Sequence, residues 1–521
     1  MKTCITANIF GISCLFIGQG CHNTDKVPGN RRKPNLLFIW TDEQQAGTMG
    51  AYGNNIIKTP NLDKLARESF VFKNAYVTQP VSTPSRASIM TGLYPHTLGC
   101  TTNNIPLPDS IDCLPGLLDD SAYVTGYLGK WHLGNEVFSQ KGFDTWISIE
   151  DIYSEFFSED KDKNSRSSYH NWLVGKGLTP DQNDNKFSRE FSSKLSIDNC
   201  KPKFLEEKAC EFLVQNKNDP FILYVNFLEP HMPFSGPLNE MYKSEEVKIP
   251  ESFNDPLEEN EPLRYKLKRE KILKTYGNTE DDFRKLIARY WGLVSQVDMS
   301  IGVILNKLKD LGLDENTIVV FTSDHGDLMG AHRMAEKSVM YQEAVRIPLL
   351  IKIPTIKATP RIIESQVSQL DIIPTMLDLM KGTKNAKLQG KTILPLISGE
   401  KTEEDFIFIE WNPDKNNGTF QKSKLASDEE IVLAENSITR TVISPDGWKL
   451  CLSDGDRSQL FDLIKDPYEK TNLFTLPEYR QKITFLSGKI SEWQKLTNDT
   501  VFIPEITTTG SGQGVTVDAN Y

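Results

Sequence analysis

Cysteine and histidine are scarce in this chain of 521 residues, and it has no excess of positive charge. It contains 8 Cys and 7 His, with no Cys-x-x-Cys pair and no Cys/His spacing typical of zinc sites. Its net charge of −11 argues against non-specific binding to nucleic acid, which depends on clustered Lys and Arg. The composition therefore disfavours a zinc site and a nucleic-acid partner.

The N-terminus has no apolar run of the roughly 20 residues that a membrane-spanning helix needs. It has instead Lys2 followed by a shorter apolar stretch over residues 5–18, which is typical of a signal peptide. We expect a signal peptide over residues 1–21 and an exported protein, periplasmic or lipid-anchored at the cell envelope. Lipidation of Cys21 and simple cleavage are the two alternatives for its processing.

The cysteines beyond Cys21 are odd in number: Cys100, Cys113, Cys200, Cys210 and Cys451. Disulfide bonds joining Cys100 to Cys113 and Cys200 to Cys210 are one interpretation of their spacing. Buried free thiols are the other.

Three apolar runs each lead into polar residues of the kind that bind ligands. They are residues 36–40 before Asp42 and Glu43, residues 221–228 before Glu229 and His231, and residues 317–322 before Asp324 and His325. Such buried strands, separated by helical patterns, are typical of a parallel sheet, in which the carboxyl ends of the strands meet at one edge. We therefore expect a single site at this edge.

The order of these patterns predicts an α/β protein with a large mixed, mostly parallel sheet between helices. We expect a linker over residues 22–33, the main domain over 34–389, and a smaller C-terminal α+β subdomain with an antiparallel sheet over 390–521. Polar stretches at 150–219 and 235–282 lack clear periodicity and are interpreted as insertions around the site. The expected helices are 61–70, 290–311 and 479–496, and the expected C-terminal strands are 406–411, 438–443, 448–452 and 459–463.

The run from Pro80 to Gly92 has the pattern of a helix start and end. Ser82 stands at an N-cap-like position, Pro84 lies in the first turn and Gly92 ends the helix. A plain capped helix does not explain Arg86, a charge one turn inside and directed back toward the helix start. Because helix N-termini attract anions, this run is a candidate anion site.

Three blocks in this sequence resemble the type I, formylglycine-dependent sulfatases of the alkaline phosphatase superfamily. They are Ser82-x-Pro84-x-Arg86 with Thr91-Gly92, then residues 127–134 with Lys130 and His132, then residues 323–348 with Asp324 and Lys337. Strand alternation is expected to place Lys130 and His132 on one face. In this family the first signature residue is oxidised to formylglycine, and Ser82 implies the serine-type bacterial route through a sulfatase-maturing enzyme. The resemblance also implies an alkaline-phosphatase-like fold.

The resemblance further implies a divalent metal, with the ligands Asp42, Glu43, Ser82, Asp324 and His325. Carboxylate oxygens suit a hard cation, so we expect Ca²⁺, with Mg²⁺ as the alternative. Many family members have Asp at the position of Glu43 and Asn at that of His325. We interpret both residues as ligands, and a hydrogen bond to the formylglycine is the alternative role of His325.

The implied reaction is hydrolysis of a sulfate ester. The hydrated aldehyde of residue 82 attacks sulfur, and Arg86 holds its diol in place. Lys130, His231 and Lys337 would surround the sulfate oxygens. His231 is also the candidate general acid toward the departing alcohol, and His132 is the candidate base that expels sulfate.

The export signal and the polar insertions favour a sulfated carbohydrate as substrate: a glycosaminoglycan, a mucin or an algal glycan. One alternative is a phosphonate monoester or phosphodiester hydrolase of the same superfamily. An alternative of another class is an inactive protein that binds sulfated glycans and keeps Ser82 unmodified.

Overall fold

The structure is a computed structural model that describes Met1 and residues 33–354, 356, 359–382, 388–400, 405–414 and 422–504. Apart from Met1 and residue 33, the expected signal peptide, with Cys21, and the expected linker lie outside the described residues. Among the helices that the structure describes, none combines the length and the apolar character needed to cross a membrane.

Within the described residues, the main sheet has eight strands, seven of them parallel to one another. Only β7 runs antiparallel to its neighbours, which confirms the prediction of a mixed, mostly parallel sheet. In spatial order the strands are β4 (Thr145–Ile147), β3 (Val124–Gly129), β5 (Phe221–Pro230), β1 (Asn35–Asp42), β6 (Thr317–Ser323), β7 (Arg346–Lys352), β2 (Phe70–Tyr76) and β8 (Ile362–Ser368).

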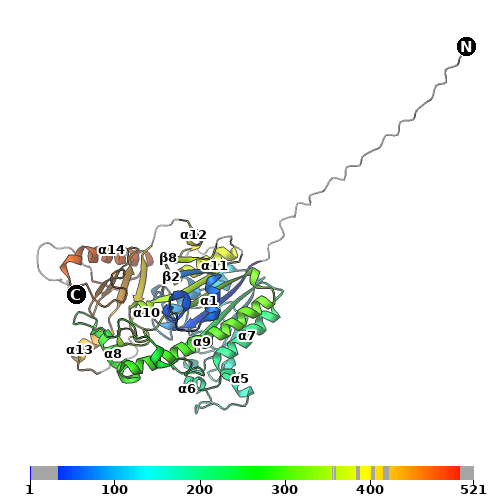
Figure 1. Ribbon diagram of the computed structural model, residues 1–521, viewed down its shortest axis with the longest axis horizontal. Coiled ribbons are helices and arrows are strands. Elements are labelled where there is room, and N and C mark those ends of the chain that lie inside the picture. Colours follow the sequence, from blue (N-terminus) through cyan, green and yellow to red (C-terminus); the bar gives the residue numbers. More distant parts are fainter. Residues whose placement is uncertain are drawn as a thin grey trace.

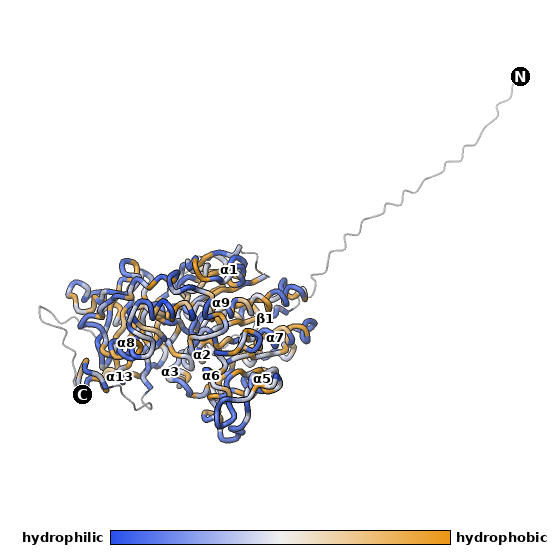
Figure 2. The backbone as a smooth tube through the Cα atoms, turned by 60° about the horizontal axis from the view of Figure 1, so that its bottom comes forward, coloured by the Kyte–Doolittle hydropathy of each residue, from blue (hydrophilic) through white to orange (hydrophobic). Residues whose placement is uncertain are grey.

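Alternate residues of the central strand β1 point to opposite faces of the sheet and enter two different cores. Phe38 and Trp40 pack with helices α2, α4 and α11, whereas Leu37 and Ile39 pack with α1, α7 and α9. Figure 1 shows the long helix α9 lying beside α7 along the sheet. In Figure 2, apolar residues surround β1 and polar residues lie at the periphery. The bounds of these helices are α1 (Pro60–Arg67), α2 (Ser82–Thr91), α4 (Leu114–Leu118), α7 (Lys201–Gln215), α9 (Glu280–Asp310) and α11 (Ile372–Met380).

A second, four-stranded antiparallel sheet lies in the C-terminal part, as the sequence predicted. Its strands in spatial order are β12 (Gln459–Asp462), β11 (Trp448–Ser453), β10 (Thr439–Ile443) and β9 (Ile407–Trp411). Helix α14 (Arg480–Thr497) lies along one face of this sheet (Figure 1). Its apolar side chains pack there with Val442 and Leu450. On the other face, Ile409 and Ile443 join the core of the main sheet. The two sheets therefore share a continuous hydrophobic core.

The remaining helices are short or lie around the edges of the sheets. They are α3 (Pro95–Leu98), α5 (Ser168–Gly175), α6 (Arg189–Ser193), α8 (Leu263–Tyr276), α10 (Gln342–Val345), α12 (Leu394–Ser398) and α13 (Asp428–Glu435).

Three of the element predictions need correction. The first polar stretch, expected to be irregular over 150–219, contains the regular helix α7, which buries Phe204, Leu205 and Phe212 against the sheet. The second contains α8, and α9 begins at Glu280, ten residues before the predicted start. A capping box between Thr279 and Asp282 fixes that start. Helices α7 and α8 carry many charged residues on their outer faces. The overall composition of these stretches therefore did not reveal the apolar positions that face the core.

Two smaller predictions also differ from the structure. The helix expected over residues 61–70 ends at Arg67, because strand β2 already begins at Phe70. The cysteines Cys100, Cys113, Cys200, Cys210 and Cys451 are all free, so the disulfide interpretation is wrong. The interpretation as buried free thiols is confirmed for all of them except Cys210, which is half-buried.

Candidate active site

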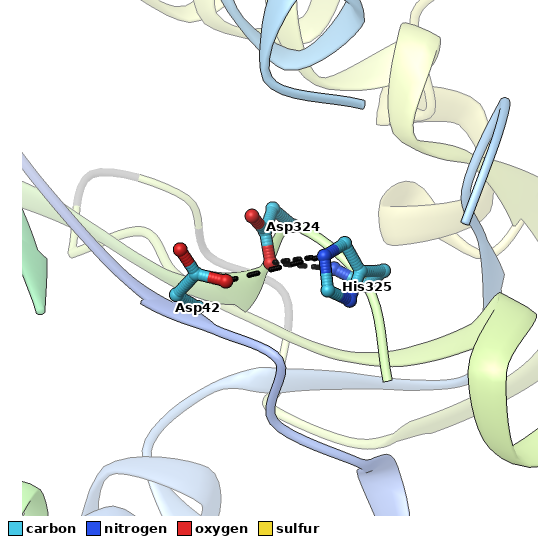
Figure 3. Close-up of side chains that lie close together, drawn as sticks. All are labelled: Asp42, Asp324 and His325. Atoms are coloured by element: carbon cyan, nitrogen blue, oxygen red, sulfur yellow. Dashed lines mark hydrogen bonds and ion pairs between the residues drawn. The ribbon is translucent and has the colours of Figure 1, made fainter. Parts of the chain in front are cut away.

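The candidate active site lies where two strand ends meet the start of helix α2. Asp42 ends β1, Asp324 and His325 directly follow β6, and Ser82 is the first residue of α2. One ligand atom from each of Asp42, Asp324 and His325 lies within 4.8 Å of the others, and Figure 3 shows the three side chains facing a common point. The structure thus brings together the residues that the strand-end pattern had placed at one edge.

Arg86 connects the two strand ends from a fully buried position. Its Nη2 donates to Asp42 Oδ2 at 2.8 Å, and its Nε donates to Asp324 Oδ2 at 2.9 Å. Its Nη1 donates to the carbonyl of Lys130 and to Asn226 Oδ1. Burial alone would raise the pKa of Asp42, but the charges of Lys130 and Arg86 hold it well below its usual value. The site therefore keeps at least one ionised carboxylate.

Glu43 has a left-handed backbone, with φ of 71°, which aims its side chain back into the site. Its N–H donates to Asp324 Oδ1 at 2.9 Å, and its carbonyl accepts from the Tyr290 hydroxyl at 2.6 Å. Its Oε2 accepts from Lys337 Nζ at 2.7 Å and lies 3.5 Å from His231 Nε2. Burial raises the pKa of Glu43 to about 8 although Lys337 opposes this. A cation beside this carboxyl would favour its ionised form.

Ser82 is 2% exposed, and its Oγ lies 3.1 Å from His325 Nε2. The N-cap is Val81, so Ser82 is one residue inside the position that the sequence suggested. The predicted end of the helix is confirmed, because Gly92 is the C-cap and has φ of 73°. Ser82 therefore stands at the first helical turn, with its side chain turned to the strand end at His325.

Lys130 and His132 do not lie on a strand, which corrects the expectation that strand alternation aligns them. Strand β3 ends at Gly129, and His132 has φ of 60° in the following turn. The Glu136 carboxylate accepts the backbone N–H groups of Trp131 and His132 at 2.8 and 2.7 Å and so holds this turn. The turn after β3, and not the alternation of side chains along a strand, places Lys130 and His132 at the site.

Two of the three histidines of the site, His132 and His231, differ in their partners but share a depressed pKa. Burial is the main cause for both, followed by the charge of Lys130 at His132 and of Lys337 at His231. His132 Nε2 lies 2.9 Å from Asn104 Oδ1, and His231 Nδ1 lies 2.8 Å from the Met232 carbonyl. In the ligand-free site both imidazoles are therefore neutral near pH 7.

Lys130 is a buried cation of the site. Its Nζ donates to Asp42 Oδ2 at 2.5 Å, and burial lowers the pKa of Lys130 to about 8. Lys337, paired with Glu43, has its pKa raised above the usual value, since the nearby carboxylates outweigh its burial. Both amines border the space next to Asp42, so an anion that entered there would meet two positive charges.

Several residues of the site were missed by the sequence interpretation. They are Asn104, Glu136, Tyr153, Asn226 and Tyr290, which contact His132, its turn, Arg86 or Glu43. Asn226 and Glu136 had a local signal, because they stand near strand ends that carry other site residues. Asn104, Tyr153 and Tyr290 come from loops and a distant helix, where nothing in the local sequence marks them.

The donor set at the site fits a hard divalent cation. Asp42, Asp324 and His325 form one group of converging ligand atoms, and Asp42, Glu43 and His231 form a second. Asp42 Oδ1 and Glu43 Oε1 are buried without a hydrogen-bond partner within the described residues. Unpaired buried carboxylate oxygens are costly unless a cation or a donor meets them. Most of the donors are oxygens, which suits Ca²⁺ or Mg²⁺ better than zinc.

This chain is similar to known proteins in sequence and in fold. The sequence pattern of the family described as Sulfatase matches residues 34–383. An ulvan-active sulfatase from Formosa agariphila is 30% identical over 471 residues, covering 88% of this chain and 81% of that protein.

Two solved structures share the fold. BT4656, in complex with its substrate D-glucosamine-2-N,6-O-disulfate, aligns with a TM-score of 0.68 at 23% identity, covering 90% of this chain and 99% of that chain. The phosphonate monoester hydrolase SpPMH from Silicibacter pomeroyi aligns with a TM-score of 0.75 at 19% identity, covering 90% and 96%. These alignments confirm the predicted fold class.

Proposed function

Since this chain belongs to the sulfatase family of sulfuric ester hydrolases, we propose that it removes sulfate from a sulfated carbohydrate. One observation carries the proposal: the start of α2, at Ser82, meets the ligand atoms of Asp42, Asp324 and His325 under a group of basic side chains. Preorganised positive charge of this kind stabilises an anion where negative charge develops.

The proposal includes oxidation of Ser82 to formylglycine by a sulfatase-maturing enzyme. Ser82 is 2% exposed in the folded chain, so an enzyme reaches it only before folding or after local opening. The hydrated aldehyde would supply the oxygen that attacks sulfur. Arg86 is already oriented by four hydrogen bonds to the strand ends, which fixes the geometry around residue 82.

The proposal also includes one divalent cation, Ca²⁺ or else Mg²⁺. Asp42, Glu43, Asp324, His325 and residue 82 would hold it. When bound, it would lower the pKa of the attacking hydroxyl and neutralise charge on the sulfate. The unpaired oxygens of Asp42 and Glu43 support this ligand set.

His132 and His231 would divide the proton transfers. His132 is neutral in the free site and has Nδ1 without a partner in the described residues, as a base requires. His231 starts neutral as well, and a bound sulfate would raise its pKa by placing negative charge beside the ring. Protonated in this way, His231 can donate to the departing alcohol. Lys130 and Lys337 would hold the sulfate oxygens.

A sulfated carbohydrate is favoured over a small aryl or choline ester on two grounds. The matched protein from Formosa agariphila is named ulvan-active, and the aligned structure of BT4656 holds a disulfated glucosamine. In this chain, polar insertion residues border the site, including Tyr153, whose ring centroid lies 4.3 Å from that of His132. Glycosaminoglycan, mucin and algal saccharides remain the candidate substrates. Export to the periplasm or envelope belongs to the same proposal, since its signal lies outside the described residues.

Mass spectrometry on protein from a host with serine-type maturation tests the nucleophile. Conversion of Ser82 to formylglycine lowers the mass by about 2 Da, because two hydrogens leave. We expect this loss in wild type, none in Ser82→Ala, and release of sulfate by wild type only. Full sulfatase turnover by protein with unmodified Ser82 would contradict the proposal.

A phosphonate monoester hydrolase is the second candidate, because SpPMH shares the fold at a TM-score of 0.75. Wild-type kcat/KM for a sulfate ester and for a phosphonate monoester with the same leaving group separates the two functions. We expect the sulfate ester to be preferred. If neither is hydrolysed while a sulfated glycan binds, the protein is the inactive binder considered above.

A further inference from the structure

A narrow pocket lies beside the candidate active site and shares the His231 side chain as a wall. We call it the Gln296 pocket. Its polar lining comes from four separate parts of the chain: Arg189 of α6, Lys201 of α7, Glu229 at the end of β5, and Gln296 of α9. The role proposed above for the site does not use this pocket.

Gln296 is buried in this pocket with most of its hydrogen-bonding capacity unused. It is 2% exposed, and neither amide atom makes a hydrogen bond within the described residues. Its polar neighbour is the Cys200 thiol, a weak hydrogen-bonding group. Glu229 Oε2 is also buried without a partner. Buried polar atoms are rarely left unpaired, so two such side chains lining one pocket point to a ligand.

Arg189 is held rigidly at the wall of the pocket by the first polar insertion. Its Nε donates to Glu150 Oε2 at 2.6 Å, and its Nη2 donates to the Tyr153 hydroxyl at 2.9 Å. Its Nη1 makes no hydrogen bond in the part of the chain that the structure describes. The ring of Tyr153 in turn lies against His132. The pocket is therefore lined by His231 and connected through Arg189 and Tyr153 to His132.

The free groups of the pocket include donors and acceptors in equal measure. Gln296 Nε2 and Arg189 Nη1 donate, while Gln296 Oε1 and Glu229 Oε2 accept. A sulfate group offers only acceptors, and an aromatic ring offers neither. Hydroxyl groups both donate and accept, so they match this mixture.

We propose that the Gln296 pocket binds hydroxyl groups on the ring carbons next to the sulfated carbon of the substrate. The His231 imidazole separates the pocket from the sulfate site. A sugar whose sulfate lies on one side of the imidazole therefore places its adjacent hydroxyls on the other side, in the pocket. The pocket then selects sugar sulfates over aryl sulfates. This inference rests on the sulfatase function proposed above and deepens it.

The test replaces Gln296 by leucine, which removes the amide and keeps a side chain of similar size. Three substrates are compared by kcat/KM: 4-nitrophenyl sulfate, the best substrate from a panel of glucosamine, galactosamine and galactose monosulfates, and its analogue lacking the hydroxyl next to the sulfate. We expect Gln296→Leu to lower kcat/KM for the sugar sulfate at least about tenfold, because binding sites built for hydroxyls discriminate strongly. The value for 4-nitrophenyl sulfate should change less than about twofold, since that ester has no such hydroxyl.

The deoxy analogue and two further variants complete the test. Wild type should discriminate against the deoxy analogue, and Gln296→Leu should largely lose this discrimination. Arg189→Lys keeps the positive charge but removes the planar set of guanidinium N–H donors. This variant should reduce turnover of the sugar sulfate selectively. Asn306→Leu is the matched control, because Asn306 is an exposed amide on the same helix and does not line the pocket.

The possible outcomes separate the inference from the function on which it rests. Equal losses on sugar and aryl sulfates, or a marked fall in Tm for Gln296→Leu, would assign the amide a structural role and overturn the inference. Unchanged turnover of the sugar sulfate would overturn it as well. If wild type releases no sulfate from any of the substrates, the proposed function itself fails, and the pocket assignment fails with it.

Discussion

Arg86 is the residue on which the geometry of the site depends most. It is fully buried, and it pairs with two carboxylates, Asp42 and Asp324, that are fully buried as well. Its guanidinium also lies over the ring of Trp40, with 4.9 Å between Cζ and the ring centroid. Removing one partner from a buried ionic network leaves the remaining charges uncompensated, which costs far more than the network adds to stability.

Arg86→Met is expected to lower the free energy of unfolding by about 3–5 kcal/mol, because Asp42 and Asp324 lose their shared partner. Urea unfolding of wild type and variant measures the difference. Arg289→Met on the exposed face of α9 is the control and should change stability by less than about 0.5 kcal/mol. A similar small change for Arg86→Met would show that Arg86 does not hold the strand ends together.

His231→Asn is expected to affect alkyl and aryl sulfates differently. A general acid matters most when the leaving group is basic, so kcat/KM for a sugar or alkyl sulfate should fall by about 10²–10⁴. The fall for 4-nitrophenyl sulfate, whose leaving group needs no proton, should be much smaller. Steady-state kinetics with both esters decide the matter, and equal falls would instead make His231 a binding residue only.

At the scale of elements, the end of strand β3 decides where Lys130 and His132 lie. Gly129 has φ of 123°, and a Cβ built there would be 1.9 Å from the carbonyl oxygen of Asn226 on the neighbouring strand β5. No side chain fits this approach. The chain therefore leaves the strand at Gly129 and turns toward the site.

Gly129→Ala should displace the turn from Lys130 to His132 and reduce both stability and kcat. The added methyl group would collide with the backbone of strand β5, and a positive φ is strained for alanine. We therefore expect the free energy of unfolding to fall by at least about 1 kcal/mol. Gly488→Ala in α14 is the control, because nothing lies within 4 Å of its added Cβ. It should be neutral or stabilising by up to about 1 kcal/mol. Thermal unfolding and sulfate release report both effects.

At the scale of the whole molecule, His96 joins the main part of the chain to the C-terminal sheet. Its ring packs against Tyr94 and Trp493. Its Nδ1 lies 2.7 Å from Glu410 Oε1 on strand β9. Burial lowers the pKa of His96, but the hydrogen bond and charge of Glu410 outweigh it and raise the pKa above the usual value. The stabilising ion pair therefore exists only while His96 is protonated.

This raised pKa predicts a pH-dependent contribution to stability. Because the folded-state pKa exceeds the unfolded one, the contribution is complete below about pH 6.5 and is lost as pH rises through the folded-state pKa. The His96→Gln variant should therefore have a Tm that lies further below that of wild type at pH 6 than at pH 9. A variant whose Tm differs from wild type equally at both values would show that the ion pair adds nothing.

Cation binding should also stabilise the whole fold, since the proposed ligands come from β1, α2 and the segment after β6. A ligand that binds only the folded state adds about 2.7 kcal/mol at a concentration of about 100 times its Kd. We expect Tm to fall on treatment with EDTA and to recover on addition of Ca²⁺. Asp324→Asn should weaken this response, and an EDTA-insensitive Tm would argue against a bound cation.

Much of the fold followed from periodicity and order alone. The runs before Asp42, Glu229 and Asp324 became β1 and its two neighbours β5 and β6, because long apolar segments bounded by polar residues have few other solutions. The C-terminal strands were also predicted closely. Helix α7 was missed because its buried positions are interrupted by lysine and glutamate, which a tertiary contact accommodates but composition does not reveal.

Which residue types meet at the strand ends followed from the sequence, since parallel strands place their carboxyl ends at one edge whatever the loops do. How these residues meet depends on the packing of the whole chain. The turn after Gly129, the left-handed backbone of Glu43 and the approach of Asn104, Tyr153 and Gln296 depend on contacts between segments far apart in the chain. Such contacts are set by packing of the whole fold, and packing leaves no local pattern in the residues on either side.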